Sequence, residues 1–264
     1  MAVVASANGT RRSAERRPAR RADAIVHDLL ERIVSSDLNA GDLLPTEPTL
    51  CDSYGVSRTV IREAVKSLEE KGLVTARQGI GTLVSPQEAW NLLDPALLAA
   101  IVRHDERYEV LDQLIGVRTA LESQMARDAA RRATPTDIHE LSQLMDELDA
   151  SIKTPEHMDD LDVIFHERIM LASGNQLARA IVRTVHAEAR RSIRYSGKSS
   201  VSDRELSNKQ HRAVLAAIIA GDADEAAAKM TAHINEAWER RRPRKGRGPA
   251  RLDAHRPRRG LPPS

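Results

Sequence analysis

The sequence predicts a mainly α-helical protein with two domains. Its 264 residues are 41% hydrophobic but only 2% aromatic, and Ala, Leu, Glu and Arg, which favour helices over strands, are abundant instead. Apolar residues recur three and four positions apart in several segments, which is the spacing of amphipathic helices. The length suits two domains of roughly 100–200 residues each. We therefore expect a helical fold and exclude a large β-sandwich.

The composition is typical of a cytoplasmic protein. The single cysteine, Cys51, has no internal partner for a disulfide, which favours a reducing compartment. No apolar run approaches the ~18 residues that a membrane span needs. The first residues place a short apolar stretch before the charges, which is the reverse of a secretory signal. We expect no membrane partner.

Basic residues gather at both ends of the chain. Residues 1–22 contain six arginines and one glutamate, and residues 240–264 contain ten basic residues and one aspartate. Both segments mix Arg with Pro and Gly and lack apolar periodicity. We therefore predict a disordered basic arm over residues 1–22 and a disordered basic tail over residues 243–264. Such tails either add salt-sensitive affinity for nucleic acid or are solvated without a role.

Residues 23–85 predict three helices followed by a short hairpin. Thr46 and Ser57 are placed to cap the second and third helices, and Gly55 between them can adopt a left-handed turn. Apolar residues of the third helix recur with helical spacing and leave a basic outer face. The expected elements are helices over residues 23–37, 46–53 and 58–71 and strands over residues 73–76 and 83–84.

Together these elements predict a winged helix-turn-helix domain over residues 23–85. The N-terminus of the third helix carries hydroxyl and guanidinium groups that can enter a DNA major groove and bind base edges or phosphates. The alternative is an ordinary amphipathic helix with a solvated basic face. The segment contains six basic and ten acidic residues, so only the local clustering favours DNA. The expected DNA-binding residues are Thr46, Ser57, Arg58, Thr59, Arg62, Lys66, Gln78 and Gly79.

Several short runs in this segment form a dense set of motifs. They are Leu44–Glu47, Gly55–Thr59, Arg62–Ala64, Gly72–Val74 and Gly79-x-Gly81-Thr82. The set resembles the DNA-binding domain of the GntR family of transcription regulators, which implies a double-stranded DNA partner. Pro48 departs from the family, because many members carry a DNA-contacting Arg there. Proline is tolerated in the first turn of a helix but cannot make that contact, so we expect either lower affinity or compensation by the basic arms.

The second half of the chain predicts helices alone. Residues 86–105 are expected to form a linker and a connecting helix that starts at Asp94-Pro95, and residues 106–242 an all-α bundle of six helices. Thr134-Pro135 and Thr154-Pro155 each offer a capping threonine followed by a proline in the first helical position.

Four side chains in this bundle have the chemistry of metal ligands. Asp162 and His166 lie four residues apart, on one face of a helix, while His211 and His233 lie on two later helices. Three imidazoles and one carboxylate suit a divalent metal with positions left for water or ligand. From spacing alone the signal is weak, because the chain has nine histidines and a lone histidine on a helix is more often a surface or core residue than a metal ligand.

The bundle also contains the motifs of a known ligand-binding domain. They include Val117-Arg118 with Glu122, Asp162-x-x-Phe165-His166, Ala172–Asn175, His211-Arg212 and Met230-x-x-His233. They resemble the FCD domain of the FadR subfamily, which implies dimerisation, effector binding and a divalent metal held by Asp162, His166, His211 and His233. Zinc is the first expectation, with nickel or manganese as alternatives. Gln210 departs from the glutamate that often precedes the third ligand.

The same resemblance implies an effector site beside the metal. Arg118 corresponds to a position that faces the effector carboxylate, and we expect Glu122 and Asn175 to belong to the same site. A guanidinium beside a metal suits a bidentate carboxylate. The alternative is a surface ion pair between Arg118 and Glu122, worth a few tenths of a kcal/mol. The linker Trp90–Asp94 resembles that of galactonate-operon repressors in this subfamily, which indicates a sugar acid.

These features together predict an effector-responsive, sequence-specific transcription regulator and not an enzyme. We expect a homodimeric repressor on a palindromic operator, released by a small carboxylate metabolite at the metal site. One alternative is a metal-dependent hydrolase or isomerase with a DNA-binding appendage, which the lack of a nucleophile elbow, phosphate loop or catalytic carboxylate pair disfavours. The other is a constitutive architectural DNA-binding protein whose helical domain only dimerises.

Overall fold

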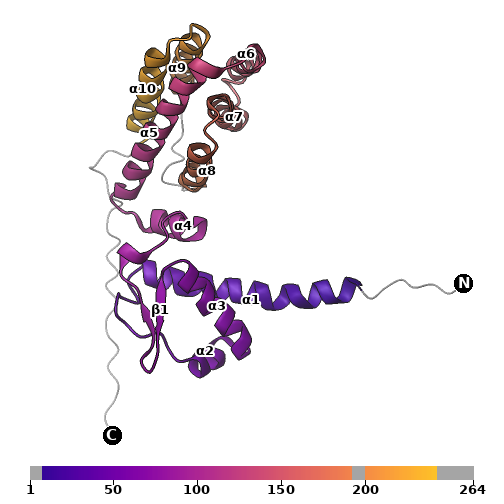
Figure 1. The fold of residues 1–264 in the computed structure, drawn as a ribbon, viewed down its shortest axis with the longest axis vertical. Coiled ribbons are helices and arrows are strands. Elements are labelled where there is room, and N and C mark those ends of the chain that lie inside the picture. Colours follow the sequence, from indigo (N-terminus) through magenta and orange to yellow (C-terminus); the bar gives the residue numbers. More distant parts are fainter. Residues whose placement is uncertain (1–7, 192–199, 243–264) are drawn as a thin grey trace, which may run out of the picture.

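A computed structural model of the chain describes residues 8–191 and 200–242. Within these residues, ten α-helices, a short 3-10 helix and one two-stranded sheet form two bodies stacked along the long axis of the molecule (Figure 1). The mainly α-helical fold class is confirmed. None of the described helices is long and apolar enough to cross a membrane.

The N-terminal body is a winged helix-turn-helix domain. Strands β1 and β2 pair antiparallel as the wing, with Val74 opposite Val84. The predicted turn chemistry is present: Gly55 has a left-handed conformation (φ 62°), and the Thr46 hydroxyl accepts the N–H of Thr49 at 3.4 Å. The elements are α1 (Asn8–Val34), α2 (Glu47–Tyr54), α3 (Arg58–Glu70), β1 (Val74–Arg77) and β2 (Gly81–Val84).

Helix α1 begins earlier than the sequence analysis expected. Residues 8–22 were predicted to be a disordered arm, but α1 starts at Asn8 and projects beyond the domain (Figure 1). The prediction is wrong for these residues because Arg, Ala and Glu are strong helix formers and the helix is already nucleated by its buried C-terminal half, where Leu29 and Leu30 pack in the core. Residues 1–7 and the predicted tail 243–264 lie outside the described residues.

Helix α4 (Pro95–His104) belongs to the cores of both bodies. It follows a 3-10 helix (Gln87–Ala89), and the Asp94 side chain caps it by accepting the N–H of Leu97 at 2.9 Å. Leu97 and Ala100 are buried in the core of the DNA-binding domain, whereas Leu98 and Val102 are buried in the core of the helical domain. The segment predicted as a linker and connecting helix therefore packs against both domains.

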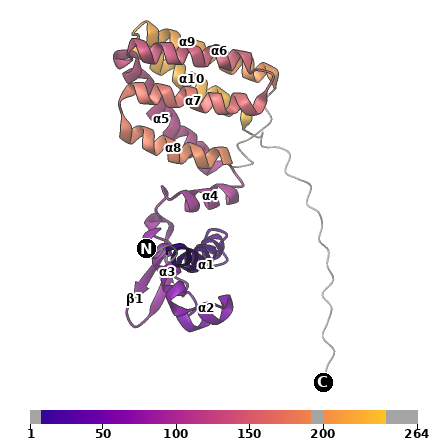
Figure 2. The same cartoon turned by 90° about the vertical axis from the view of Figure 1, so that its right-hand side faces the viewer.

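The described residues of the helical domain form the six helices that the sequence predicted, arranged in two layers. Helices α6, α7 and α8 are stacked one above another, and α8 packs against α4. Helices α5, α9 and α10 form the second layer (Figures 1 and 2). The Thr134 cap is confirmed as a capping box with Asp137. The bounds are α5 (Glu109–Arg132), α6 (Pro135–Ala150), α7 (Pro155–Ser173), α8 (Gln176–Arg191), α9 (Val201–Ile219) and α10 (Ala223–Arg241).

Candidate metal centre and DNA-binding surface

Four candidate ligands from three helices meet at one point inside the helical domain. Asp162 and His166 come from α7, His211 from α9 and His233 from α10, and one ligand atom of each lies within 4.8 Å of the others. The Nε2 atom of His233 is 3.2 Å from that of His166 and 3.0 Å from that of His211. Asp162 Oδ1 is 3.4 Å from His211 Nε2. We call these four residues the histidine–aspartate cluster.

The packing of the helices explains this convergence. Asp162 and His166 share one face of α7 because they are separated by about one helical turn. Phe165 beside them is fully buried, and its ring centre lies 4.7 Å from that of His211. The three histidines are 0–3% exposed, while the Asp162 side chain retains 22% exposure. The cluster is therefore enclosed by the core and reaches solvent through its carboxylate.

Hydrogen bonds orient two of the imidazoles toward the centre. His166 Nδ1 lies 2.5 Å from Glu122 Oε2, and His233 Nδ1 lies 3.3 Å from Gln210 Oε1. An Nδ1–H donated to either oxygen leaves the Nε2 lone pair facing the cluster, as in metal sites whose histidines are held by a second partner. Within the described part of the chain, His211 Nδ1 is buried without a hydrogen-bond partner, so the contacts of Nε2 decide which ring nitrogen of His211 carries the proton. This donor set fits zinc, nickel or manganese.

Burial and mutual proximity set the charges in the cluster. Burial lowers the pKa of His211 to about 3 and that of His233 well below its usual value. Burial alone would raise the pKa of Asp162, but the nearby imidazoles of His166 and His211 outweigh it and hold that pKa well below normal. Neutral His211 and His233 with an ionised Asp162 are the forms that bind a divalent cation.

Glu122 connects Arg118 to the cluster. Its carboxylate accepts a hydrogen bond from Arg118 Nε and contacts His166. Burial alone would raise its pKa, but the charge of Arg118 and the hydrogen bond with His166 outweigh this effect and hold the pKa well below normal. The ion pair between Arg118 and Glu122, considered above as a surface pair, is present but buried, with side chains 7% and 1% exposed. Glu122 therefore holds both the guanidinium and the imidazole in place.

Asn175 occupies a different position from the other two expected effector residues. It precedes α8, and its Oδ1 accepts the N–H of Ala178 at 3.1 Å while its own N–H donates to Ser173 Oγ at 3.1 Å. As placed, the side chain serves as a helix cap.

Two residues near the cluster were not assigned to it from the sequence. Gln210 was noted only as a departure from the family pattern, yet it contacts His233. His186 on α8 is 8% exposed, and burial and the charge of Arg118 lower its pKa well below normal. Its place beside Val182 and Val185, which share the buried face of α8, is a periodicity signal that could have marked it.

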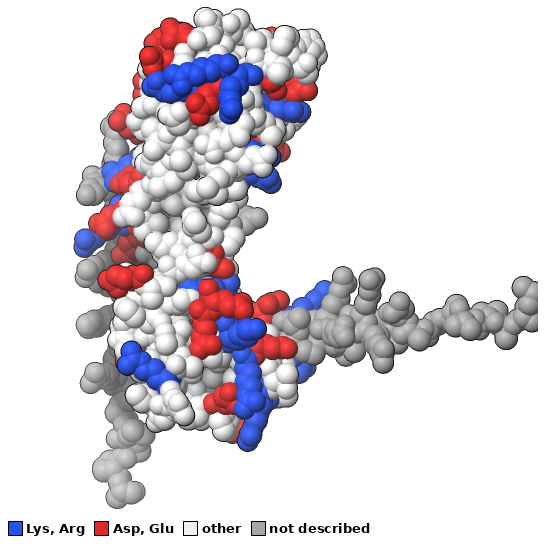
Figure 3. Space-filling model, in the orientation of Figure 1, with Lys and Arg blue, Asp and Glu red and all other residues white. Residues whose placement is uncertain are grey.

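The expected DNA-binding side chains lie together on the helix-turn-helix and its wing. Ser57 occupies the N-cap of α3 without a side-chain cap bond, Arg62 Nε lies 3.0 Å from Glu47 Oε1, and Gly79 at the wing tip has φ 77°. On the face shown in Figure 3, basic and acidic side chains are interspersed over this domain. The exposed residues are Thr46, Ser57, Arg58, Thr59, Arg62, Lys66, Gln78 and Gly79.

The fold and the two sites together define a class of protein: a transcription regulator with a DNA-binding domain joined to a helical FCD-type domain. Residues 21–84 match the family of bacterial regulatory proteins named gntR, and residues 113–236 match the FCD domain. The chain is 34% identical to the uncharacterized HTH-type transcriptional regulator YieP of Escherichia coli, covering 76% of this chain and 87% of that protein. The chain therefore belongs to the GntR family.

Two further relatives in Escherichia coli are named after operons. The galactonate operon transcriptional repressor is 28% identical, with 77% of this chain and 89% of that protein covered. The putative L-lactate dehydrogenase operon regulatory protein is 32% identical, with 83% and 85% covered. The relatives are named as regulators, in agreement with the prediction that the protein is not an enzyme.

Proposed function

We propose that this protein is a homodimeric repressor that leaves its operator when a small carboxylate binds at the histidine–aspartate cluster. The DNA-binding domain and the family support the regulatory part of this proposal. The repressor role, the dimer, the metal and the effector are the parts that the proposal adds.

The convergence of three buried imidazoles and one carboxylate is the observation that carries the proposal. Such a donor set is expensive to bury without a cation, because each polar atom loses its hydration. A bound divalent ion, with zinc first and nickel or manganese as alternatives, would supply open coordination positions for ligand oxygens. Asp162, His166, His211 and His233 would hold it, while Glu122 and Gln210 orient two of the imidazoles.

The neighbouring charges favour an anionic effector. The carboxylate of Glu122 bridges Arg118 and His166, because it contacts both side chains. A fixed guanidinium beside a cation attracts a carboxylate and can bind it in a bidentate manner. The names of two relatives refer to galactonate and L-lactate, and both compounds are 2-hydroxy acids whose hydroxyl and carboxylate oxygens can chelate one metal. We therefore propose a 2-hydroxy carboxylate, with a sugar acid first.

The effector signal would pass through α4, α5 and α8. Arg118 and Glu122 lie on α5, and α4 packs against α8 while being buried in both domain cores. An effector that prefers one arrangement of these helices shifts the orientation of the DNA-binding domains by its differential affinity for the two states. In a symmetric dimer, the two α3 helices would then lose their match to the two half-sites of a palindrome.

Selection of binding sites from random double-stranded DNA tests this function. The full chain should enrich an inverted repeat, and light scattering should show two chains per DNA. Enrichment of a single unrepeated site would overturn the dimeric operator. The absence of any enriched sequence would overturn sequence-specific regulation and favour the architectural alternative.

A further inference from the structure

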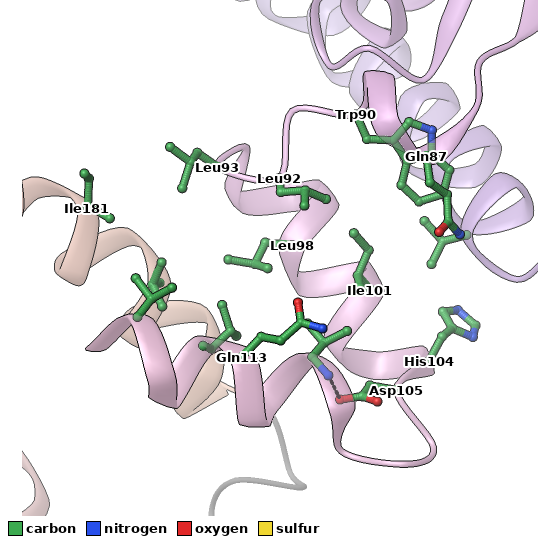
Figure 4. Close-up of a pocket in the computed structure, with 15 residues that line it drawn as sticks. Gln87, Trp90, Leu92, Leu93, Leu98, Ile101, His104, Asp105, Gln113 and Ile181 are labelled. Carbon is green, nitrogen blue, oxygen red and sulfur yellow. Dashed lines mark hydrogen bonds between the residues drawn. The ribbon is translucent and has the colours of Figure 1, made fainter. Parts of the chain in front are cut away.

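A cavity lies between the two domains and shares no lining residue with the histidine–aspartate cluster. It has a volume of about 500 Å³ and is bounded by the end of α1, the linker before α4, α4 itself, α5 and α8 (Figure 4). Pockets of about 300–1,000 Å³ at domain junctions are the usual places for small organic ligands. The cavity is thus large enough for a molecule of one or two rings.

The lining of the cavity selects an uncharged, mostly apolar molecule. Among the described residues, no Lys or Arg lines it, and its walls are dominated by aliphatic side chains and by Trp90. The carboxylate of Asp105 accepts the backbone N–H groups of Glu109 and Val110 at 3.0 and 2.9 Å, so it acts as a helix cap. Gln87 and Gln113 add neutral amide groups (Figure 4). The imidazole of His104 also lines the cavity, and its Nε2 atom lies 3.0 Å from Glu31 Oε2. This chemistry does not suit the carboxylate proposed for the cluster.

The surroundings of the cavity are equally apolar. Leu92 and Leu93 line it and are each 53% exposed, and Val117 is 42% exposed. In Figure 3, the middle of the face shown carries few charged side chains, whereas charged groups gather over the DNA-binding domain and at the far end of the helical domain. The exposed rim of the cavity is therefore apolar where Leu92, Leu93 and Val117 border it.

The cavity is placed to connect ligand binding with domain orientation. Val34 and Trp90 belong to the side of the DNA-binding domain and Ile181 to the helical domain, so one ligand would contact both. Val117 lies next to Arg118 on α5, so the same helix borders the cavity and carries the network that reaches the cluster.

We propose that this cavity is a second ligand site, for an uncharged and largely apolar organic molecule, and that occupancy favours the arrangement of the two domains seen here. The site is independent of the metal-dependent function proposed above, because it shares no side chain with the cluster and takes a different class of ligand.

The uncharged fluorophore N-phenyl-1-naphthylamine, which brightens in apolar surroundings, provides a direct test with the full chain. It should bind saturably, with one site per chain, and should raise the midpoint of thermal unfolding. Val117→Trp fills the cavity from a position that is already partly exposed, and it should weaken binding at least tenfold. Val201→Trp is the matched control, since Val201 is 45% exposed on α9 and does not line the cavity; its affinity should stay within twofold of the parent.

Three results would overturn the proposal. The parent could show no saturable binding of the fluorophore, or Val117→Trp could bind it as well as Val201→Trp does. Binding that disappears as the protein concentration rises through the range of dimer formation would mean that a second copy of the chain covers the cavity. Circular dichroism of both variants establishes that any lost binding comes from a folded protein.

Discussion

Acidification from pH 7 to pH 5 should destabilise the metal-free protein, and His211 should account for much of the loss. The pKa of this imidazole is about 3 in the folded protein and 6.5 in the unfolded chain. At pH 5 the unfolded form therefore binds a proton that the folded form does not, so protons favour unfolding. The stability is fully present above pH 6.5 and declines as the pH falls toward 3.

The magnitude follows from the difference between the two pKa values. A pH of 5 lies 1.5 units below the pKa of 6.5 of the unfolded imidazole, and each unit corresponds to about 1.4 kcal/mol. The contribution of His211 is therefore about 2 kcal/mol. Solvent screening does not reduce this figure, because the side chain is 0% exposed.

Urea denaturation followed by circular dichroism measures this loss in the presence of EDTA. His211→Leu places an apolar side chain in the buried position. It should reduce the loss of unfolding free energy between pH 7 and pH 5 by about 2 kcal/mol. His157→Leu, which removes an exposed imidazole from the same domain, is the control. It should lose as much unfolding free energy between pH 7 and pH 5 as the parent does. If His211→Leu loses as much stability on acidification as the parent does, the buried neutral imidazole is not the cause.

Three further results are expected. Arg58→Ala should cost ~1–3 kcal/mol of affinity for the selected DNA if the side chain reads a base. Lys66→Ala should weaken binding mildly and equally on all sequences. An anisotropy titration in which the Arg58 variant and the parent bind with equal affinity would contradict this. Gly72→Ala should lower the unfolding free energy by about 1–3 kcal/mol, because Gly72 has φ 73° and a Cβ atom there would lie 2.0 Å from the Ala89 carbonyl oxygen; an unchanged urea midpoint would refute it. Arg118→Ala should leave metal binding intact but weaken a carboxylate effector by ~2–5 kcal/mol in calorimetry, and undiminished affinity would exclude the guanidinium from the effector site.

The sequence predicted most helices well because their ends carry local signals. Thr46, Gly55 and the Thr134-Pro135 pair act within a few residues, so their caps and turns form as expected. The start of α1 was missed because arginine-rich composition was interpreted as disorder. The helix propensity of the same residues, together with the buried half of the helix, extends α1 to Asn8 instead.

The convergence of the cluster could not be derived from spacing. Asp162 and His166 form a pair through helical geometry alone, but His211 and His233 join them only when α7, α9 and α10 all pack against α5. The family resemblance supplied this tertiary information. The buried role of Glu122 likewise depends on the approach of α7 to α5, which turns a possible surface pair into a support for His166.

The sequence of α4 indicates that this helix is buried in both domains, although the sequence analysis did not predict it. The run Ala96–Val102 is apolar nearly all round, and a helix without a polar face is buried on more than one side. Leu97 and Leu98 are adjacent and therefore face different directions, which is why one enters the DNA-binding core and the other the helical core.

The affinity for the selected operator DNA, measured with and without metal, tests the central claim most directly. Zinc-loaded protein and protein treated with EDTA should bind the DNA, and galactonate or L-lactate should weaken binding at least tenfold in the zinc-loaded protein only. His211→Leu should keep DNA binding and lose the response. Metal analysis of the same samples should find one ion per chain before EDTA treatment. Release of the DNA by a carboxylate from protein that holds no metal would contradict the account.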